Sequence, residues 1–188
     1  MTESNFANAG ALGLCAFGMT TLLAMFLDFT ERPADSLVWG MMIFYGGLLQ
    51  LIVGIIECKK GSTFGTVAFT SYGAFWMSFA FMNIAVALGF AAPDHVFKGV
   101  YFFGWGFLTF MLFFGTLKTN RALQAVFGLL TVVFVGLGAG SLLQNGDVTV
   151  AAAAIGIVLG LLAMYTGLAE VINEVNRKEV LPLFPVSK

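Results

Sequence analysis

The side chains within the apolar parts of this sequence that could do chemistry are mostly neutral and polar. In the stretch 64–92, Tyr72 and Asn83 are eleven residues apart. That spacing is three helical turns, so both side chains lie on one face of a helix, and Phe79 lies between them on the same face. Such a face lines a path for a solute or supplies hydrogen bonds between helices. We favour the path and keep the second interpretation open.

Small and polar residues recur at helical spacing in three further stretches. In 9–27, a stripe at spacings of three and four consists of Gly10, Gly13, Phe17, Thr20 and Ala24. In 37–56, Gln50 places one amide on a face of glycines. The third stripe is Ala152, Gly156 and Gly160, a pattern typical of close contact between helices, within a protomer or between subunits. These faces predict a helical bundle around a narrow, neutral path, which suits a small uncharged or singly charged solute.

Asp, Glu, Lys and Arg are missing from the centres of the apolar stretches. Asp28, Glu57 and Glu170 lie near their ends, where a solvated helix end is the expected environment, and the single histidine, His95, lies in a predicted loop. Ion-coupled pumps place charges at membrane depth, and an enzyme needs an activated nucleophile or a general base. We therefore expect no enzymatic activity, no cofactor and no metal.

Membrane-spanning helices must position these residues. Of 188 residues, 59% are apolar and 10% are charged, and the mean hydropathy is +0.93, whereas soluble domains carry about 25% charged residues. A net charge of −1 gives no reason to expect nucleic acid. About 20 apolar residues cross a bilayer, and charge-free stretches of that kind lie at about 9–27, 37–56, 64–92, 99–117, 122–143 and 148–169. We predict a single all-α integral membrane domain over residues 1–188, with six transmembrane helices bundled around a central pore in each protomer.

The basic residues predict the orientation of this bundle. With six spans, both termini and the second and fourth loops share one side, which carries Lys59, Lys60, Lys118, Arg121, Arg177, Lys178 and Lys188. The opposite side carries Arg32 and Lys98. Because cytoplasmic loops are rich in Lys and Arg, we expect both termini in the cytoplasm and a multi-pass protein in the plasma membrane.

Three segments resemble signatures of the acetate uptake transporter family, the succinate–acetate permeases. Residues 8–14, Asn-Ala-Gly-Ala-Leu-Gly-Leu, resemble the first-helix signature Asn-Pro-Ala-Pro-Leu-Gly-Leu, with Ala9 and Ala11 in place of the prolines. Residues 64–76 are similar to the third-helix motif, and residues 115–121 to the fourth loop. The resemblance implies a six-helix protomer that assembles as a hexamer, with acetate, succinate or related carboxylates as cargo.

The resemblance also implies that each pore is narrowed by a hydrophobic triplet, which by position is Phe17, Tyr72 and Leu130. As polar contacts along the path we expect Asn8, Thr20, Gln50, Ser71 and Asn83. Amides and hydroxyls replace part of a carboxylate's hydration without holding it as tightly as a buried Lys or Arg. The predicted function is therefore a membrane channel or permease for acetate and other short carboxylates such as succinate. Two alternatives are a channel for small neutral solutes such as urea or short amides, and a membrane scaffold protein without transport.

Overall fold

The computed structural model describes residues 7–33 and 35–186, which form a bundle of long helices. The elements are α1 (Ala9–Phe29), α2 (Ser36–Gly40), the π-helix η1 (Met41–Leu49), α3 (Gln50–Lys59), α4 (Thr63–Ala87), α5 (His95–Thr116), α6 (Arg121–Leu142) and α7 (Gly146–Asn176). Because α2, η1 and α3 follow one another without a break, they form one rod, Ser36–Lys59. Within the described residues there is no strand, and one isolated bridge pairs Asn120 with Pro185. The protein is all-α, as predicted.

Five of the six rods are long and apolar enough to cross a membrane, and α4 falls outside that set. Its threonines, serines, Tyr72 and Asn83 lower its mean hydropathy. α4 packs mainly against α3 and η1. A helix that lines a path for a solute is expected to be more polar than the helices around it.

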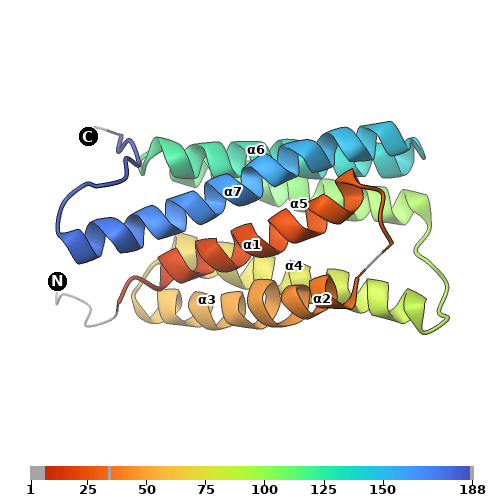
Figure 1. Ribbon diagram of the computed structural model, residues 1–188, viewed down its shortest axis with the longest axis horizontal. Helices are drawn as coiled ribbons and strands as arrows, with labels where there is room; N and C mark the ends of the chain where they lie inside the picture. The colour runs from red at the N-terminus through yellow and green to blue at the C-terminus, as the bar shows by residue number, and fades with distance from the viewer. Residues whose placement is uncertain (1–6, 34, 187–188) are drawn as a thin grey trace.

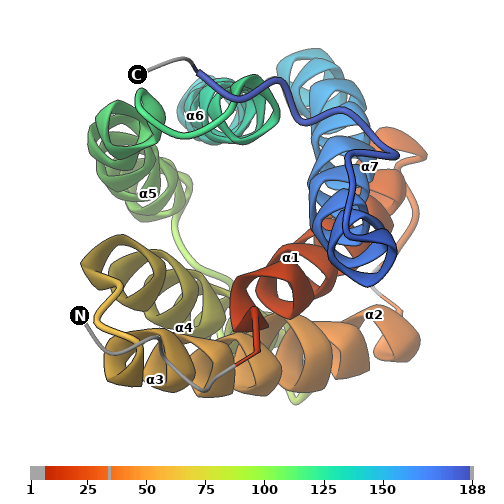
Figure 2. The same cartoon turned by 90° about the vertical axis from the view of Figure 1, so that its left-hand side faces the viewer.

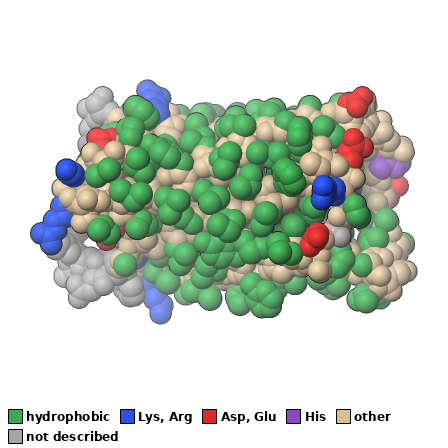
Figure 3. Space-filling model, in the orientation of Figure 1, with side chains coloured by type: hydrophobic (Ala, Val, Ile, Leu, Met, Phe, Trp, Pro, Cys, Tyr) green, Lys and Arg blue, Asp and Glu red, His purple; other side chains and the backbone are tan. Residues whose placement is uncertain are grey.

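The rods are arranged around a common axis. In the view along the bundle, α1, α4, α5, α6 and α7 form a ring, and the rod of α2, η1 and α3 lies outside it against α1 and α4 (Figure 2). The start of α1 and the segment that follows α7 lie at the same end of the bundle (Figure 1). Apolar side chains cover most of the visible flank, and charged side chains gather toward its two ends (Figure 3). This distribution is typical of a protein whose flank faces lipid.

The helix boundaries between α4 and α5 differ from the charge-free stretches in the sequence. α4 ends at Ala87 instead of continuing to residue 92, because Gly89 adopts a left-handed conformation with φ +94°. α5 begins at His95, since the Asp94 carboxylate accepts hydrogen bonds from the amides of Val96 and Phe97 and caps the helix. His95 therefore opens a helix and does not lie in a loop.

α7 extends about two turns beyond the predicted end, to Asn176. The returning chain supports this extension. Asn173 Oδ1 accepts hydrogen bonds from the amides of Val180 and Leu181, and its Nδ2 donates to the Leu181 carbonyl. The Tyr165 hydroxyl donates to the Pro182 carbonyl. The C-terminal segment thereby runs back across the end of the bundle toward Thr119, whose carbonyl accepts from the Val186 amide.

The small-residue stripe of α7 packs inside the protomer. A Cβ at Gly156 would meet the Met25 side chain, and a Cβ at Gly160 would meet backbone atoms of Gly18 and Leu22. Ala152 lies against Gly136 of α6. The stripe therefore joins α7 to α1 and α6, which corrects the idea that it is available to another subunit.

Candidate functional site

A cavity of about 140 Å³ opens at the end of the bundle where α1 starts and α7 ends, and we call it cavity A. α1, α3, α4, α6 and α7 all contribute to its wall. Most of that wall is apolar, and its polar side chains are Gln50, Glu57, Ser62, Tyr72 and Glu170. The cavity is large enough for a few water molecules or one small organic acid.

A second, smaller cavity of about 20 Å³, cavity B, continues toward the opposite end. Its wall is almost wholly apolar and aromatic, and it includes Phe75 and Phe79 of α4. Phe17 and Leu130 line both cavities, while Tyr72 lines cavity A. The three buried side chains are thus gathered where the two cavities meet, with 5.5 Å between the ring centroids of Phe17 and Tyr72.

The Tyr72 hydroxyl is held by a residue that sequence reasoning missed. Its oxygen lies 3.0 Å from Oγ1 of Thr109, a fully buried residue of α5. The Thr109 hydroxyl donates to the Trp105 carbonyl at 2.7 Å, so Tyr72 is the donor in the bond between them. A single threonine in the apolar run of α5 carries no sequence signal that pairs it with Tyr72.

Of the five predicted polar contacts, Gln50 and Asn8 lie at cavity A and the other three lie elsewhere. Gln50 lines cavity A, where its Nε2 donates to the Gly13 carbonyl at 3.3 Å, and Asn8 donates to Glu170 of the cavity wall at 2.7 Å. Thr20 instead faces the π-helix η1, where a Cβ at Gly46 would meet its side chain. Ser71 is half-buried and does not line cavity A or B.

Asn83 lies near the other end of the bundle, in a third cavity of about 410 Å³ that we call cavity C. Lys98 and Trp39 also line this cavity, and the Asn83 amide donates to the Phe79 carbonyl at 2.8 Å. One face of α4 therefore lines the three cavities in turn, with Tyr72 in A, Phe79 in B and Asn83 in C.

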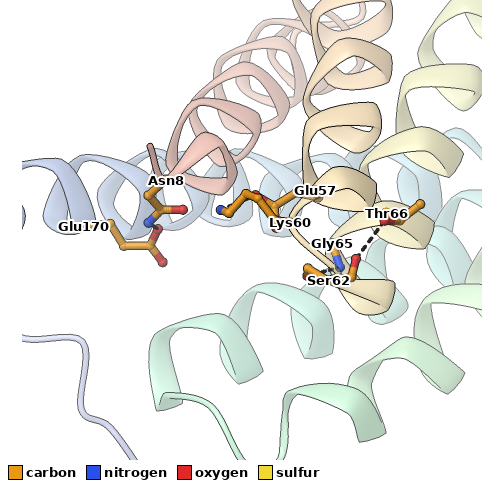
Figure 4. A network of polar contacts seen from close by, with 7 residues as sticks. All are labelled: Asn8, Glu57, Lys60, Ser62, Gly65, Thr66 and Glu170. Atoms are coloured by element: carbon orange, nitrogen blue, oxygen red, sulfur yellow. Dashed lines mark hydrogen bonds and ion pairs between the residues drawn. The ribbon is translucent and has the colours of Figure 1, made fainter. Parts of the chain in front are cut away.

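Glu57 and Glu170 are not the solvated helix ends that the sequence suggested. The Glu57 side chain is buried, with 6% of the residue exposed, and its carboxylate accepts from Lys60 Nζ at 2.7 Å. Gly65 makes room for it, since a Cβ there would lie 2.8 Å from Oε2 of Glu57. Figure 4 shows Glu57, Lys60 and Gly65, with Asn8 reaching Glu170 from the start of α1. The difference arises because α3 and α7 continue past their charge-free stretches, so that each glutamate lies within a helix and lines cavity A.

Membrane-length helices around cavities that meet at buried side chains define a helical membrane channel or permease. The chain belongs to the GPR1/FUN34/yaaH family, which it matches over residues 1–188. It is 42% identical to the succinate-acetate/proton symporter SatP of Escherichia coli strain K12, over 97% of this chain and 98% of that protein. It is also 32% identical to acetate permease A of Emericella nidulans, over 97% of this chain and 68% of that one. A solved structure of the bacterial acetate channel SatP superimposes with a TM-score of 0.93 at 43% identity, covering 95% of this chain and 99% of the other.

Proposed function

We propose that this multi-pass membrane protein is a channel or permease for acetate and other short carboxylates such as succinate, without enzymatic activity. The observation that carries the proposal is the meeting of cavities A and B at Phe17 and Leu130. The relatives support the substrate class, because those named here are described as acetate or succinate–acetate transport proteins.

We propose Phe17, Tyr72 and Leu130 as the pore constriction. A carboxylate surrounded only by hydrocarbon loses its hydration at high cost, and bulky apolar groups exclude hydrated ions by dewetting. The constriction and the apolar cavity B together form the stretch over which the solute lacks polar partners, and polar side chains line cavity A on one side and cavity C on the other. At cavity A, the polar groups are Gln50 and Glu170, and Asn8 is hydrogen-bonded to Glu170. At cavity C, the polar group is the Asn83 amide.

We further propose a plasma-membrane location with both termini in the cytoplasm, so that cavity A opens to the inside. The seven-to-two distribution of basic residues between the two sides supports this orientation. We also propose assembly as a homo-oligomer, a hexamer by the family resemblance.

The test of this function is uptake of labelled acetate into liposomes that contain only the purified protein. We expect uptake well above that of protein-free liposomes, and saturation as the acetate concentration rises. Unlabelled succinate should compete for uptake, whereas urea should neither compete nor enter faster than it does without protein. Urea entry without acetate entry would instead support the neutral-solute channel. Entry of neither solute, from folded protein, would support the scaffold.

A further inference from the structure

The contact between α4 and α5, which we call the seam, is made by side chains and not by close backbone packing. The two helices are neighbours in the ring (Figure 2), yet few of their backbone positions approach each other. Aromatic side chains from both helices fill the space between them. Among the described residues, two side-chain hydrogen bonds cross the seam. Tyr72 is bonded to Thr109 at 3.0 Å, and Ser78 is bonded to Tyr101 at 2.9 Å.

Thr109 supplies the acceptor that holds the Tyr72 hydroxyl. The Thr109 proton goes to the Trp105 carbonyl at 2.7 Å, which belongs to the backbone of α5. The Thr109 oxygen therefore faces Tyr72 as an acceptor with a fixed direction. Thr109 is fully buried and Tyr72 is 3% exposed, so water does not reach this bond from the outside. A buried hydroxyl that loses its acceptor is costly, and this bond thus fixes the far end of the Tyr72 side chain.

The Tyr72 ring spans the seam beside the place where cavities A and B meet. Its side chain begins on α4, and its hydroxyl ends at α5. The ring centroid lies 5.5 Å from that of Phe17 on α1 and 6.1 Å from that of Phe127 on α6, and the residue lines cavity A. Phe17 and Leu130 have no polar atoms in their side chains, so packing alone positions them. Tyr72 is the member of the constriction that a directional bond positions.

Building on the proposed function, we propose that Thr109 is a positioning residue that determines the size selectivity of the constriction through Tyr72. Thr109 lines neither cavity A nor cavity B, so it acts by holding the ring and not by touching the solute. Without the acceptor, the Tyr72 hydroxyl must turn toward the polar groups and water of cavity A. The ring then leaves its place beside Phe17 and Leu130 for part of the time, and a larger acid passes.

Thr109→Val tests this role, because it replaces the hydroxyl by a methyl group of similar size. Uptake of labelled succinate and labelled acetate is measured in liposomes that contain the purified variant, with protein-free liposomes subtracted. We expect the ratio of succinate to acetate uptake to rise about fivefold, equivalent to about 1 kcal/mol of barrier. Thr109→Ser keeps a hydroxyl at the same position and should recover most of the wild-type ratio.

The double variant Tyr72→Phe, Thr109→Val separates positioning from a loss of packing. Its ring has no hydroxyl to satisfy and can stay in the apolar seam, because replacing both partners of a buried hydrogen bond by apolar groups is nearly neutral. We expect its ratio of succinate to acetate uptake to return to within about twofold of the wild type. Packing damage from the Thr109→Val substitution would not be repaired by removing an oxygen from Tyr72.

Thr166→Val is the matched control. Thr166 is also fully buried, but it lies on α7, and its hydroxyl donates to the Leu162 carbonyl of its own helix at 2.8 Å. This variant should keep the wild-type ratio of succinate to acetate uptake. Each variant is first compared with the wild type by size-exclusion chromatography. If Thr109→Val elutes as aggregate, Thr109→Ala removes the same hydroxyl without adding a methyl group, and the same comparison with its Tyr72→Phe double variant decides the question.

Two outcomes separate this proposal from the function on which it rests. A folded Thr109→Val protein with the wild-type ratio, or a double variant as unselective as the single one, would remove Thr109 from the control of selectivity while leaving transport intact. Wild-type protein that takes up no more acetate than protein-free liposomes would overturn the proposed function itself.

Discussion

Phe17→Ala and Leu130→Ala are each expected to raise the uptake of succinate and lactate relative to acetate by roughly tenfold, which corresponds to about 1.4 kcal/mol of barrier. Phe17 and Leu130 line both cavity A and cavity B, so shortening either side chain joins the two spaces. A wider opening admits a larger acid and lowers the dewetting barrier. The measurement is uptake of each labelled acid into liposomes under identical gradients.

The control for this prediction is Phe107→Ala, which removes the same ring from the exposed outer face of α5. It should leave the ratio of succinate to acetate uptake unchanged. Because truncating a buried aromatic costs roughly 3–5 kcal/mol, each variant must elute at the wild-type position before its uptake is interpreted. Folded Phe17→Ala and Leu130→Ala proteins with wild-type selectivity would place the constriction elsewhere.

The second large effect is expected from Gly160→Leu, which should abolish the folded protein. A Cβ at this position would lie 2.8 Å from the Gly18 carbonyl oxygen and 2.8 Å from the Leu22 amide nitrogen. Backbone atoms on α1 cannot move aside as a flexible side chain can, so α1 and α7 must separate and lose their packing. We expect little monodisperse protein in detergent, measured by size-exclusion chromatography.

Gly104→Leu is the matched control, because a Cβ at Gly104 of α5 would meet nothing within 4 Å. This variant should elute as the wild type. A Gly160→Leu protein that stays folded but elutes with a smaller mass would instead show that the stripe on α7 joins subunits.

The sequence was sufficient to predict the all-α class, and it singled out some of the residues that line cavities A, B and C. Charge-free stretches of membrane length mark the rods, because the bilayer allows few charges within them. The three-turn spacing of Tyr72 and Asn83 identified the face of α4 that lines the cavities. The stripe in 9–27 and the family resemblance both indicated Phe17, whereas the resemblance alone supplied Leu130, which lines the same cavities from α6.

Other parts of the site depend on tertiary packing and could not be read from local patterns. Thr20 shares a stripe with Phe17, yet it is turned toward η1, whose π-helical geometry no pattern in the sequence indicated. Glu57 and Glu170 lie beyond their charge-free stretches, and burial by other elements is what makes them part of a cavity. The spacing of Glu57 and Lys60, three residues apart at a helix end, was the one local signal for their ion pair.

The central claim is that carboxylates cross the membrane through cavity A, and chemical blocking of that cavity tests it most directly. In a Cys15→Ala, Cys58→Ser background, Leu123→Cys places one thiol on the α6 wall of cavity A, and Gly104→Cys places one on the outer face of α5. Labelled acetate uptake is measured before and after treatment with a membrane-permeant methanethiosulfonate, with modification verified by mass spectrometry. We expect the reagent to remove most uptake by Leu123→Cys and to leave Gly104→Cys unaffected. Full uptake by a completely modified Leu123→Cys protein would contradict the claim.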